Sequence, residues 1–304
     1  MKTLAVIDMG SNTLLVTVGR RLEDGEIRIL LDEAEVTRLG QSLCDGGTLH
    51  PDAKHRALKA LARFKELALA KGAEGILAAG TAAFRRASDG AAFAEEITTQ
   101  LGFPVRILKG EEEAHYSFAS AEHDFGAGRG SLGMIDIGGG STEFVFGGKG
   151  PRFSLPIGTV KLTEKFVSEQ PIPDSEWNGV LKEIHSLLKE KLSEVATRPE
   201  AWAAVAATPA SLAALLLKLP VYDPAKIHGY RLTRRALEPL VEALRTSSME
   251  VRRSMPGMHP DRAELLPIGG AILLEAMKFL DAQEILVSDH GLRYGILFEE
   301  LTSS

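Results

Sequence analysis

Residues 7–19 read IDMGSNTLLVTVG, and residues 135–147 read IDIGGGSTEFVFG. The two stretches align without gaps, so that Asp8 matches Asp136 and the same kind of turn follows each aspartate. In each stretch a short apolar run reaches the aspartate, a turn of glycine and small polar residues follows, and a β-rich run comes next. Two such hairpins in register predict a duplicated domain.

The rest of the chain alternates between helix and strand patterns, which favours an α/β fold with buried sheets. Residues 51–71 form the clearest helix, because Pro51 suits a helix start and Gly72 suits a helix end. Further helices are predicted near residues 111–122, 174–196, 233–253 and 269–280, and from about 292 onward. Strands are predicted near residues 75–79, 103–108, 203–206 and 285–287.

The chain has 304 residues, more than one hydrophobic core usually supports, so two domains are expected. We place the boundary near residue 122, where residues 124–130 read DFGAGRG and indicate a turn-rich linker. The first domain then covers residues 1–122, with the closing helix at about 292–304 as a candidate to complete it. The second domain covers residues 123–304.

Net charge and composition restrict the class of function. A net charge of −6 argues against a general binder of nucleic acid or of membrane surfaces. An anionic substrate would therefore need a local pocket of basic groups or backbone amides. The sequence contains no apolar stretch long enough for a membrane span and no signal peptide, so cytoplasm is the expected location. The single cysteine, Cys44, excludes an intramolecular disulfide and a thiolate zinc cluster.

The two turns have a composition that suits phosphate binding, because consecutive backbone N–H groups in a tight turn form a concave anion site. Asp8 and Asp136 would repel phosphate, which implies a bridging cation or an ordered water. A plain polar hairpin turn explains the first motif equally well. It explains the second less well, because ordering three glycines costs backbone entropy. The candidate phosphate-binding residues are Gly10, Ser11, Asn12, Thr13, Gly138, Gly139, Gly140, Ser141 and Thr142.

Further motifs follow in order along the chain: GTAAFR at 80–85, GEEEA at 110–114, DIGGGSTE at 136–143, LPIGTVKLT at 155–163 and SDHGLR at 288–293. This series resembles the exopolyphosphatase and guanosine pentaphosphate phosphatase (Ppx/GppA) family, in its short two-domain form. The paired turns also resemble those of the wider actin-like superfamily. The resemblance implies an α/β fold of two duplicated actin-like (ribonuclease H-like) domains with a cleft between them.

The resemblance also implies roles for individual residues. Glu112 is the first candidate for the general base, and its neighbour Glu113 remains open. Three consecutive glutamates also suit the first turn of a helix without any catalytic role. Asp136 and Glu143 are similar to the family's carboxylates that organise metal or water, and Asp8 is expected to join them as a ligand of Mg²⁺ or Mn²⁺. Arg85 is expected to bind phosphate, and a surface salt bridge stays open as the alternative for its guanidinium.

Two segments depart from the family pattern. Residues 207–211 read ATPAS where a glycine-led turn is usual, and Pro209 removes an N–H donor, although Thr208 is still expected to cap the helix that follows. Tyr294 replaces an acidic residue after the last Leu-Arg pair. The histidines show no metal-ligand spacing, and His290 is interpreted as a loop histidine.

The first hypothesis for function is a hydrolase that releases terminal phosphate from polyphosphate, with guanosine pentaphosphate as a further substrate. An ATP-dependent small-molecule kinase of the same superfamily is the rival enzyme. A protein that binds a guanosine phosphate alarmone without turnover is the alternative outside enzymes. No nucleic acid or membrane partner is expected, and the oligomeric state stays open, a homodimer included.

Overall fold

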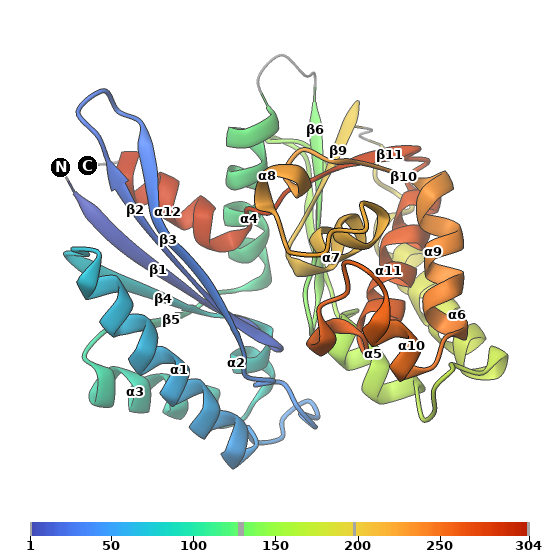
Figure 1. Ribbon diagram of the computed structural model, residues 1–304, viewed down its shortest axis with the longest axis horizontal. Coiled ribbons are helices and arrows are strands. Elements are labelled where there is room, and N and C mark those ends of the chain that lie inside the picture. Colours follow the sequence, from blue (N-terminus) through green and yellow to red (C-terminus); the bar gives the residue numbers. More distant parts are fainter. Residues whose placement is uncertain (1, 127–130, 197–198, 303–304) are drawn as a thin grey trace. The chain divides into compact units, whose positions relative to one another are not determined.

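The computed structural model describes residues 2–126, 131–196 and 199–302. It divides into two compact units, shown in Figure 1. Unit 1 comprises Met1–Ser120 together with Leu292–Ser304, and unit 2 comprises Ala121–Gly291. The chain therefore passes from unit 1 to unit 2 within helix α4 (Gly110–Phe125) and returns just before helix α12 (Leu292–Thr302).

Unit 1 is built on one mixed sheet of five strands, in the order β3-β2-β1-β4-β5. The first three strands along the chain form an antiparallel meander, whereas β1, β4 and β5 run parallel. The strands are β1 (Thr3–Met9), β2 (Thr13–Arg21), β3 (Ile27–Val36), β4 (Gly75–Gly80) and β5 (Val105–Ile107).

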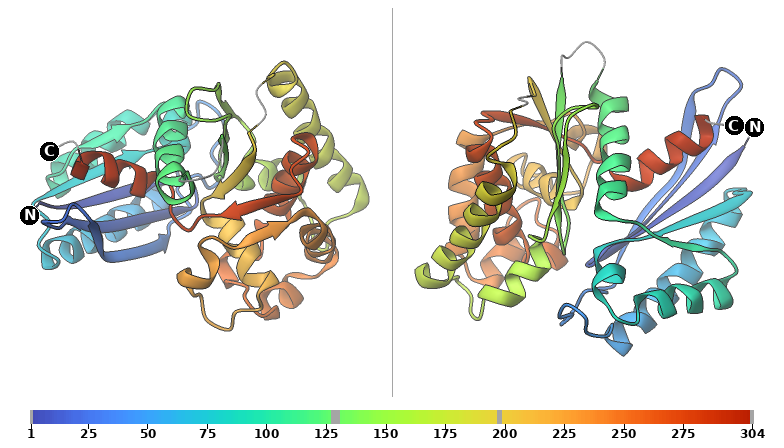
Figure 2. Two further views of the ribbon diagram at one scale, coloured as in Figure 1. Left: turned by 90° about the horizontal axis from the view of Figure 1, so that it is seen from above. Right: turned by 180° about the vertical axis from the view of Figure 1, so that it is seen from behind.

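Successive side chains of β1 point to opposite faces of the sheet, and the side chains on each face are apolar. Each face is therefore covered by helices. Ile7 and Met9 belong to the core shared with α1 (Pro51–Ala70) and α3 (Gly90–Leu101). Leu4 and Val6 belong to the core shared with α12. Figure 2 shows α12 lying against the strands of unit 1 from two further directions.

Unit 2 repeats the same plan with one extra strand. Its sheet has the order β8-β7-β6-β9-β11-β10, in which β6, β7 and β8 form the antiparallel meander and β6, β9 and β11 run parallel. Strand β10 pairs antiparallel with β11 at the edge. The strands are β6 (Leu132–Ile137), β7 (Thr142–Val145), β8 (Arg152–Leu155), β9 (Ala201–Val205), β10 (Arg231–Thr233) and β11 (Glu284–Val287).

One large apolar core joins this second sheet to its helices. The buried helix α11 contacts helices α5, α6, α7 and α9. The helices of unit 2 are α5 (Thr159–Phe166), α6 (Asp174–Leu192), α7 (Ala207–Leu216), α8 (Pro224–Ile227), α9 (Arg234–Thr246), α10 (Met249–Ser254) and α11 (Leu266–Phe279). Among the described residues no helix combines the length and the apolar character that a membrane span requires.

The predicted α/β class is confirmed, with two mixed sheets whose meanders carry the two matching motifs. Three local predictions were wrong. The helix expected over 233–253 is two helices, because the Ser248 side chain accepts a hydrogen bond from the Val251 N–H and starts α10. Thr208 does not cap α7, since the helix begins at Ala207 with Ala206 before it.

The third error concerns the linker, which we placed at 124–130. Asp124 and Phe125 are the last residues of α4, and Phe125 is buried and stacks on His228 with 5.0 Å between ring centroids. Tertiary contacts therefore extend the helix beyond the point where the sequence indicated a turn. Gly126 follows the end of the helix, and its N–H donates to the Glu122 carbonyl at 2.8 Å. Residues 127–130 of the predicted linker lie outside the described residues.

Candidate phosphate site and an aspartate–histidine cluster

The two glycine-containing turns have the same local structure. In the turn between β1 and β2 the Gly10 N–H donates to the Thr13 carbonyl at 3.1 Å, and between β6 and β7 the Gly138 N–H donates to the Ser141 carbonyl at 2.9 Å. A Cβ built on either glycine would lie only 3.0 or 3.1 Å from that carbonyl oxygen. The sequence repeat thus corresponds to a repeated structure.

The first turn contains a buried hydroxyl group without a hydrogen bond. Ser11 is 3% exposed, and its Oγ has no hydrogen-bond partner among the described residues. Leaving such a group unsatisfied costs about 1–3 kcal/mol, so a ligand oxygen at this position would be stabilising. Next to it, Asn12 Nδ2 donates to Thr13 Oγ1 at 3.3 Å.

The second turn packs tightly against the start of α5. The backbone N–H groups of Thr159 and Val160 donate to the carbonyls of Gly138 and Gly139 at 3.0 and 2.9 Å. A Cβ on Gly158 would lie 2.4 Å from the Gly139 carbonyl carbon. Part of the glycine content of this turn is therefore required by packing within unit 2. Thr142 follows in β7, and its Oγ1 donates to the Ile157 carbonyl at 2.6 Å.

Two carboxylates lie directly opposite each other in the second repeat. Asp136 on β6 pairs in register with Glu143 on β7, so both side chains belong to one face of the sheet. Glu143 is 3% exposed, and its Oε1 accepts a hydrogen bond from Ser154 Oγ at 2.7 Å. In the first repeat Asp8 pairs with Leu15, so only the second repeat carries the carboxylate pair.

Arg85 and Glu113 form an ion pair within unit 1. Arg85 is in the short helix α2 (Ala82–Arg86), and its Nη1 donates to Glu113 Oε2 and, at 2.8 Å, to the Leu108 carbonyl. Glu113 is in the first turn of α4 and only 8% exposed. The guanidinium and the carboxylate thus lie together at the start of one helix.

The neighbouring Glu112 has different surroundings. Its Oε2 accepts the Lys109 N–H at 2.8 Å, and its Oε1 pairs with the exposed Arg106. The Lys109 N–H lowers the pKa of Glu112, burial raises it, and the Arg106 guanidinium lowers it further, so that the net shift is downward. Both carboxylate oxygens of Glu112 therefore accept hydrogen bonds that stabilise the start of α4.

The predicted site residues are distributed over both units. Unit 1 holds Asp8, Arg85, Glu112, Glu113 and the first turn, and unit 2 holds Asp136, Glu143 and the second turn. Arg85 and Glu113 lie together in unit 1, and Asp136 and Glu143 lie together in unit 2. These roles remain predictions.

A group that the sequence did not predict lies in unit 2. Asp124 at the end of α4, His228 after α8 and His290 after β11 present ligand atoms that all lie within 4.8 Å of one another. Their positions in the chain are far apart, so no local spacing pattern exists that would reveal them. Only the SDHGLR motif pointed to one member, His290, which we interpreted as a loop histidine.

The protonation states in this cluster follow from its surroundings. Burial raises the pKa of Asp124, but the hydrogen bond and charge of His290, with the charge of His228, lower it more, and the net shift is downward. Burial lowers the pKa of His228 and the charge of His290 lowers it further, whereas the charges of Asp124 and Asp289 raise it by less, so the net shift is downward. The cluster thus favours an ionised carboxylate and, at His228, a neutral imidazole.

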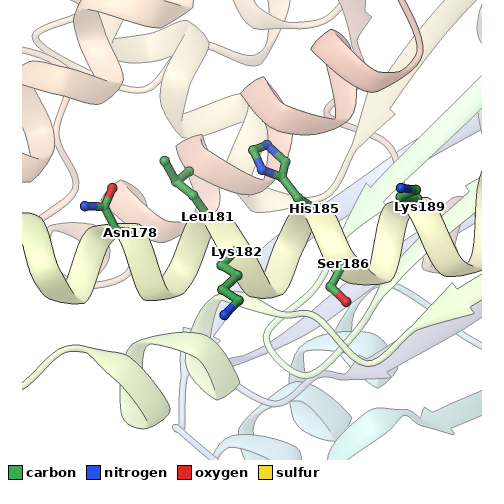
Figure 3. Close-up of a pocket in the computed structure, with 6 residues that line it drawn as sticks. All are labelled: Asn178, Leu181, Lys182, His185, Ser186 and Lys189. Carbon is green, nitrogen blue, oxygen red and sulfur yellow. The ribbon is translucent and has the colours of Figure 1, made fainter.

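A surface depression along α6 offers no comparable arrangement. Figure 3 shows Leu181 and His185 pointing to one side of the helix, and Lys182 and Ser186 to the other. His185 Nε2 is paired with Glu275. These polar groups do not converge on one point, so the depression is not a candidate site.

A model of the Ppx/GppA phosphatase family matches residues 18–304 of the chain. Exopolyphosphatase 2 of Mycobacterium tuberculosis is 29% identical over 309 residues, which cover 96% of this chain and 97% of that protein. Exopolyphosphatase 1 of the same organism is 24% identical, with 99% and 88% covered.

Solved structures agree with these sequence matches. The crystal structure of the Aquifex aeolicus member of the Ppx/GppA family has a TM-score of 0.83 at 29% identity, with 99% of this chain and 98% of that chain covered. An exopolyphosphatase from Cytophaga hutchinsonii has a TM-score of 0.91 at 24% identity, with 99% and 98% covered, a likeness of fold.

Proposed function

Because this chain belongs to the Ppx/GppA phosphatase family, we propose that it releases the terminal phosphate of inorganic polyphosphate by attack of a base-activated water. The observation that carries the proposal is the family match over residues 18–304. The paired phosphate-type turns give that match a physical basis. The same chemistry would remove the terminal phosphate of guanosine pentaphosphate, the second substrate that the proposal covers.

Phosphate binding is assigned to the two turns and to Arg85. The buried hydroxyl of Ser11 supports this assignment, because a phosphate oxygen would supply the acceptor that no described residue offers. Arg85 presents a guanidinium, which suits bidentate contact with a phosphate group. In this structure Glu113 is the acceptor for that guanidinium.

Glu113 is the proposed general base, in preference to Glu112. A phosphate group at Arg85 would replace Glu113 as the acceptor and leave its carboxylate available to take a proton from the attacking water. Glu112 is less suited, because its pKa is lowered and its oxygens accept hydrogen bonds from the Lys109 N–H and Arg106. The choice rests on surroundings that the string of three glutamates does not reveal.

The facing carboxylates fit a hard divalent cation. Asp136 and Glu143 are directly opposite on neighbouring strands, so two carboxylates belong to one face of the sheet. Their oxygen ligands suit Mg²⁺ or Mn²⁺, which when bound would offset the negative charge of the phosphates. Asp8, the aspartate of the first repeat, stays a predicted ligand of this cation.

The experiment that tests the function measures phosphate release from polyphosphates of several lengths, guanosine pentaphosphate and ATP, with Mg²⁺ and no acceptor. Release from polyphosphate is expected. Turnover of ATP only with an added acceptor would indicate a kinase. Tight binding of guanosine tetraphosphate without release from any substrate would indicate a non-catalytic binding protein. Either result would overturn the proposal.

The metal requirement has its own test. Chelator is expected to abolish phosphate release, and added Mg²⁺ or Mn²⁺ to restore it. Asp136→Asn should raise the Mg²⁺ concentration needed for half-maximal rate, whereas Asp24→Asn, in the hairpin turn between β2 and β3, should not. Full activity in excess chelator would exclude the proposed cation.

A further inference from the structure

Three side chains from distant segments of unit 2 converge on one point. Asp124 Oδ2 lies 2.9 Å from His290 Nδ1 and 3.9 Å from His228 Nε2. Ligands at about 2.0–2.1 Å from a tetrahedrally coordinated ion are about 3.4 Å apart, and the two observed separations lie on either side of that value. Small side-chain movements would thus complete the geometry.

The surroundings of the three groups also suit a metal ion. The Asp124 side chain is 6% exposed, and the side chains of His228 and His290 are 28% and 27% exposed, so the carboxylate is buried and the two imidazoles are partly accessible. Neither ring nitrogen of His228 makes a hydrogen bond to a described residue, and Nδ1 is buried. A cation at Nε2 would give this imidazole a polar partner.

A further hydroxyl group orients the ligands from outside. Ser288 Oγ accepts the His290 N–H at 3.1 Å, and its hydroxyl has two acceptors in reach, the His290 carbonyl at 3.0 Å and Asp124 Oδ2 at 3.4 Å. Supporting contacts of this kind fix the direction of metal ligands in known sites. The His228 ring is held between Phe125 and His290, with centroid distances of 5.0 and 4.4 Å.

We propose that Asp124, His228 and His290 bind one divalent transition-metal ion of the Zn²⁺ type, with water completing its coordination. Two imidazoles and one carboxylate favour such an ion, whereas Mg²⁺ favours oxygen ligands. This site uses none of the carboxylates assigned to Mg²⁺ and does not depend on the proposed phosphatase activity.

The position of the cluster gives the ion a structural role. Asp124 follows the point where the chain enters unit 2, and His290 precedes the point where it leaves. His228 comes from a third segment, between α8 and β10. One ion would therefore link the entering and the leaving segments to the body of unit 2.

Metal binding is tested on the untagged full-length protein after chelator treatment and dialysis. Zn²⁺ is titrated by calorimetry, and Co²⁺ is followed by the visible absorption of its tetrahedral complexes. One ion per chain is expected, together with a rise in Tm that depends on Zn²⁺ concentration. His228→Gln and His290→Gln should each weaken Zn²⁺ binding by at least about a hundredfold, more than the loss of a supporting contact would.

His259→Gln is the matched control, since His259 also lies 3.9 Å from an aspartate, Asp261, but outside the cluster. This variant should bind Zn²⁺ like the wild type. Circular dichroism of each variant without metal separates loss of a ligand from loss of fold. The absence of saturable binding to the wild type would refute the site, as would equal Zn²⁺ affinity in the wild type and both cluster variants.

Discussion

At the scale of single residues, Glu112 and Glu113 are adjacent but face different partners. Glu113→Gln should lower kcat for polyphosphate by about 10²–10⁴-fold, because loss of a general base has effects of this size. Glu112→Gln should keep kcat within about tenfold, since its carboxylate serves Lys109 and Arg106. Initial rates of phosphate release at saturating substrate measure both effects.

Polyphosphate binding to the Glu113→Gln variant should persist, which separates the chemical step from substrate affinity. The reverse ranking of the two variants would assign the base to Glu112. Near-normal activity of both variants would show that the general base is not a residue of α4.

Ala206 has a backbone conformation that suits glycine. Its φ of 76° and ψ of −177° lie in a region that is almost restricted to glycine. The strain of any other residue in this conformation lowers the stability of the fold by about 1–3 kcal/mol. Ala206→Gly should therefore raise the free energy of unfolding by about 1 kcal/mol. Urea denaturation measures this change, and a decrease in stability would show that the Ala206 methyl group contributes packing that outweighs the backbone cost.

Residue-level chemistry was predictable only where it follows from local sequence. Asp136 and Glu143, which the family resemblance grouped as carboxylates, are in register because a short turn joins their strands. The direction in which each of the glutamates in α4 points depends on Arg85 and Arg106, which lie outside the helix. The Asp124 cluster depends on contacts across more than a hundred residues and leaves no local pattern.

At the scale of elements, the second turn and α5 form one packed unit. Gly158→Ala would place a Cβ 2.4 Å from the carbonyl carbon of Gly139, a distance that requires backbone movement. We expect a loss of about 1–3 kcal/mol in the free energy of unfolding. The rate of phosphate release should also fall, because the turn itself must shift.

Gly75→Ala is the control for this prediction, because its Cβ would make an ordinary contact of 3.4 Å with Leu4. Chemical denaturation with activity measured in parallel compares the two variants. A Gly158→Ala protein with unchanged stability and rate would show that the turn and α5 move together without cost.

Element boundaries were predictable where a terminal residue has a strong intrinsic preference. Helix α1 begins at Pro51, and Gly72 just after it has φ of 80°, as the sequence indicated. The break between α9 and α10 was missed, because the Ser248 cap competes with a continuous apolar pattern. The end of α4 was missed because buried contacts of Phe125 extend it.

At the scale of the whole molecule, a network of buried polar side chains holds α12 against the sheet of unit 1. Arg293 Nε donates to Thr17 Oγ1 at 2.6 Å, and its Nη2 donates to both oxygens of Asp32 at 2.8 and 2.9 Å. Tyr294, which replaces the family's usual acidic residue, donates its hydroxyl to Asp32 at 2.6 Å. The departure noted in the sequence thus forms part of this network.

Arg293→Ala should lower the free energy of unfolding by about 3 kcal/mol, because it removes one partner of a largely buried pair. Arg63→Ala is the control, since Arg63 in α1 pairs at the surface with Glu33 and Glu35 of β3, the strand that carries Asp32, and its loss should cost less than about 1 kcal/mol. Thermal and urea unfolding report both. Equal losses in the two variants would show that burial of the Arg293 network contributes nothing.

The duplicated architecture was the most predictable feature, because two aligned motifs specify two equivalent meanders. The membership of α12 in unit 1 was harder to predict, since its residues follow a strand of unit 2 without a break in pattern. Leu292, Ile296, Leu297 and Leu301 are apolar like the residues of any core helix, and their packing with Leu4 and Val6 places the helix in unit 1.

The return of the last helix to the first sheet also determines an order of events during synthesis. Unit 2 is continuous in sequence and can fold while the chain is still growing, whereas one face of the β1 sheet stays uncovered until α12 leaves the ribosome. The N-terminal strands are made first but are completed last. During translation they therefore expose an apolar surface of the kind that chaperones bind.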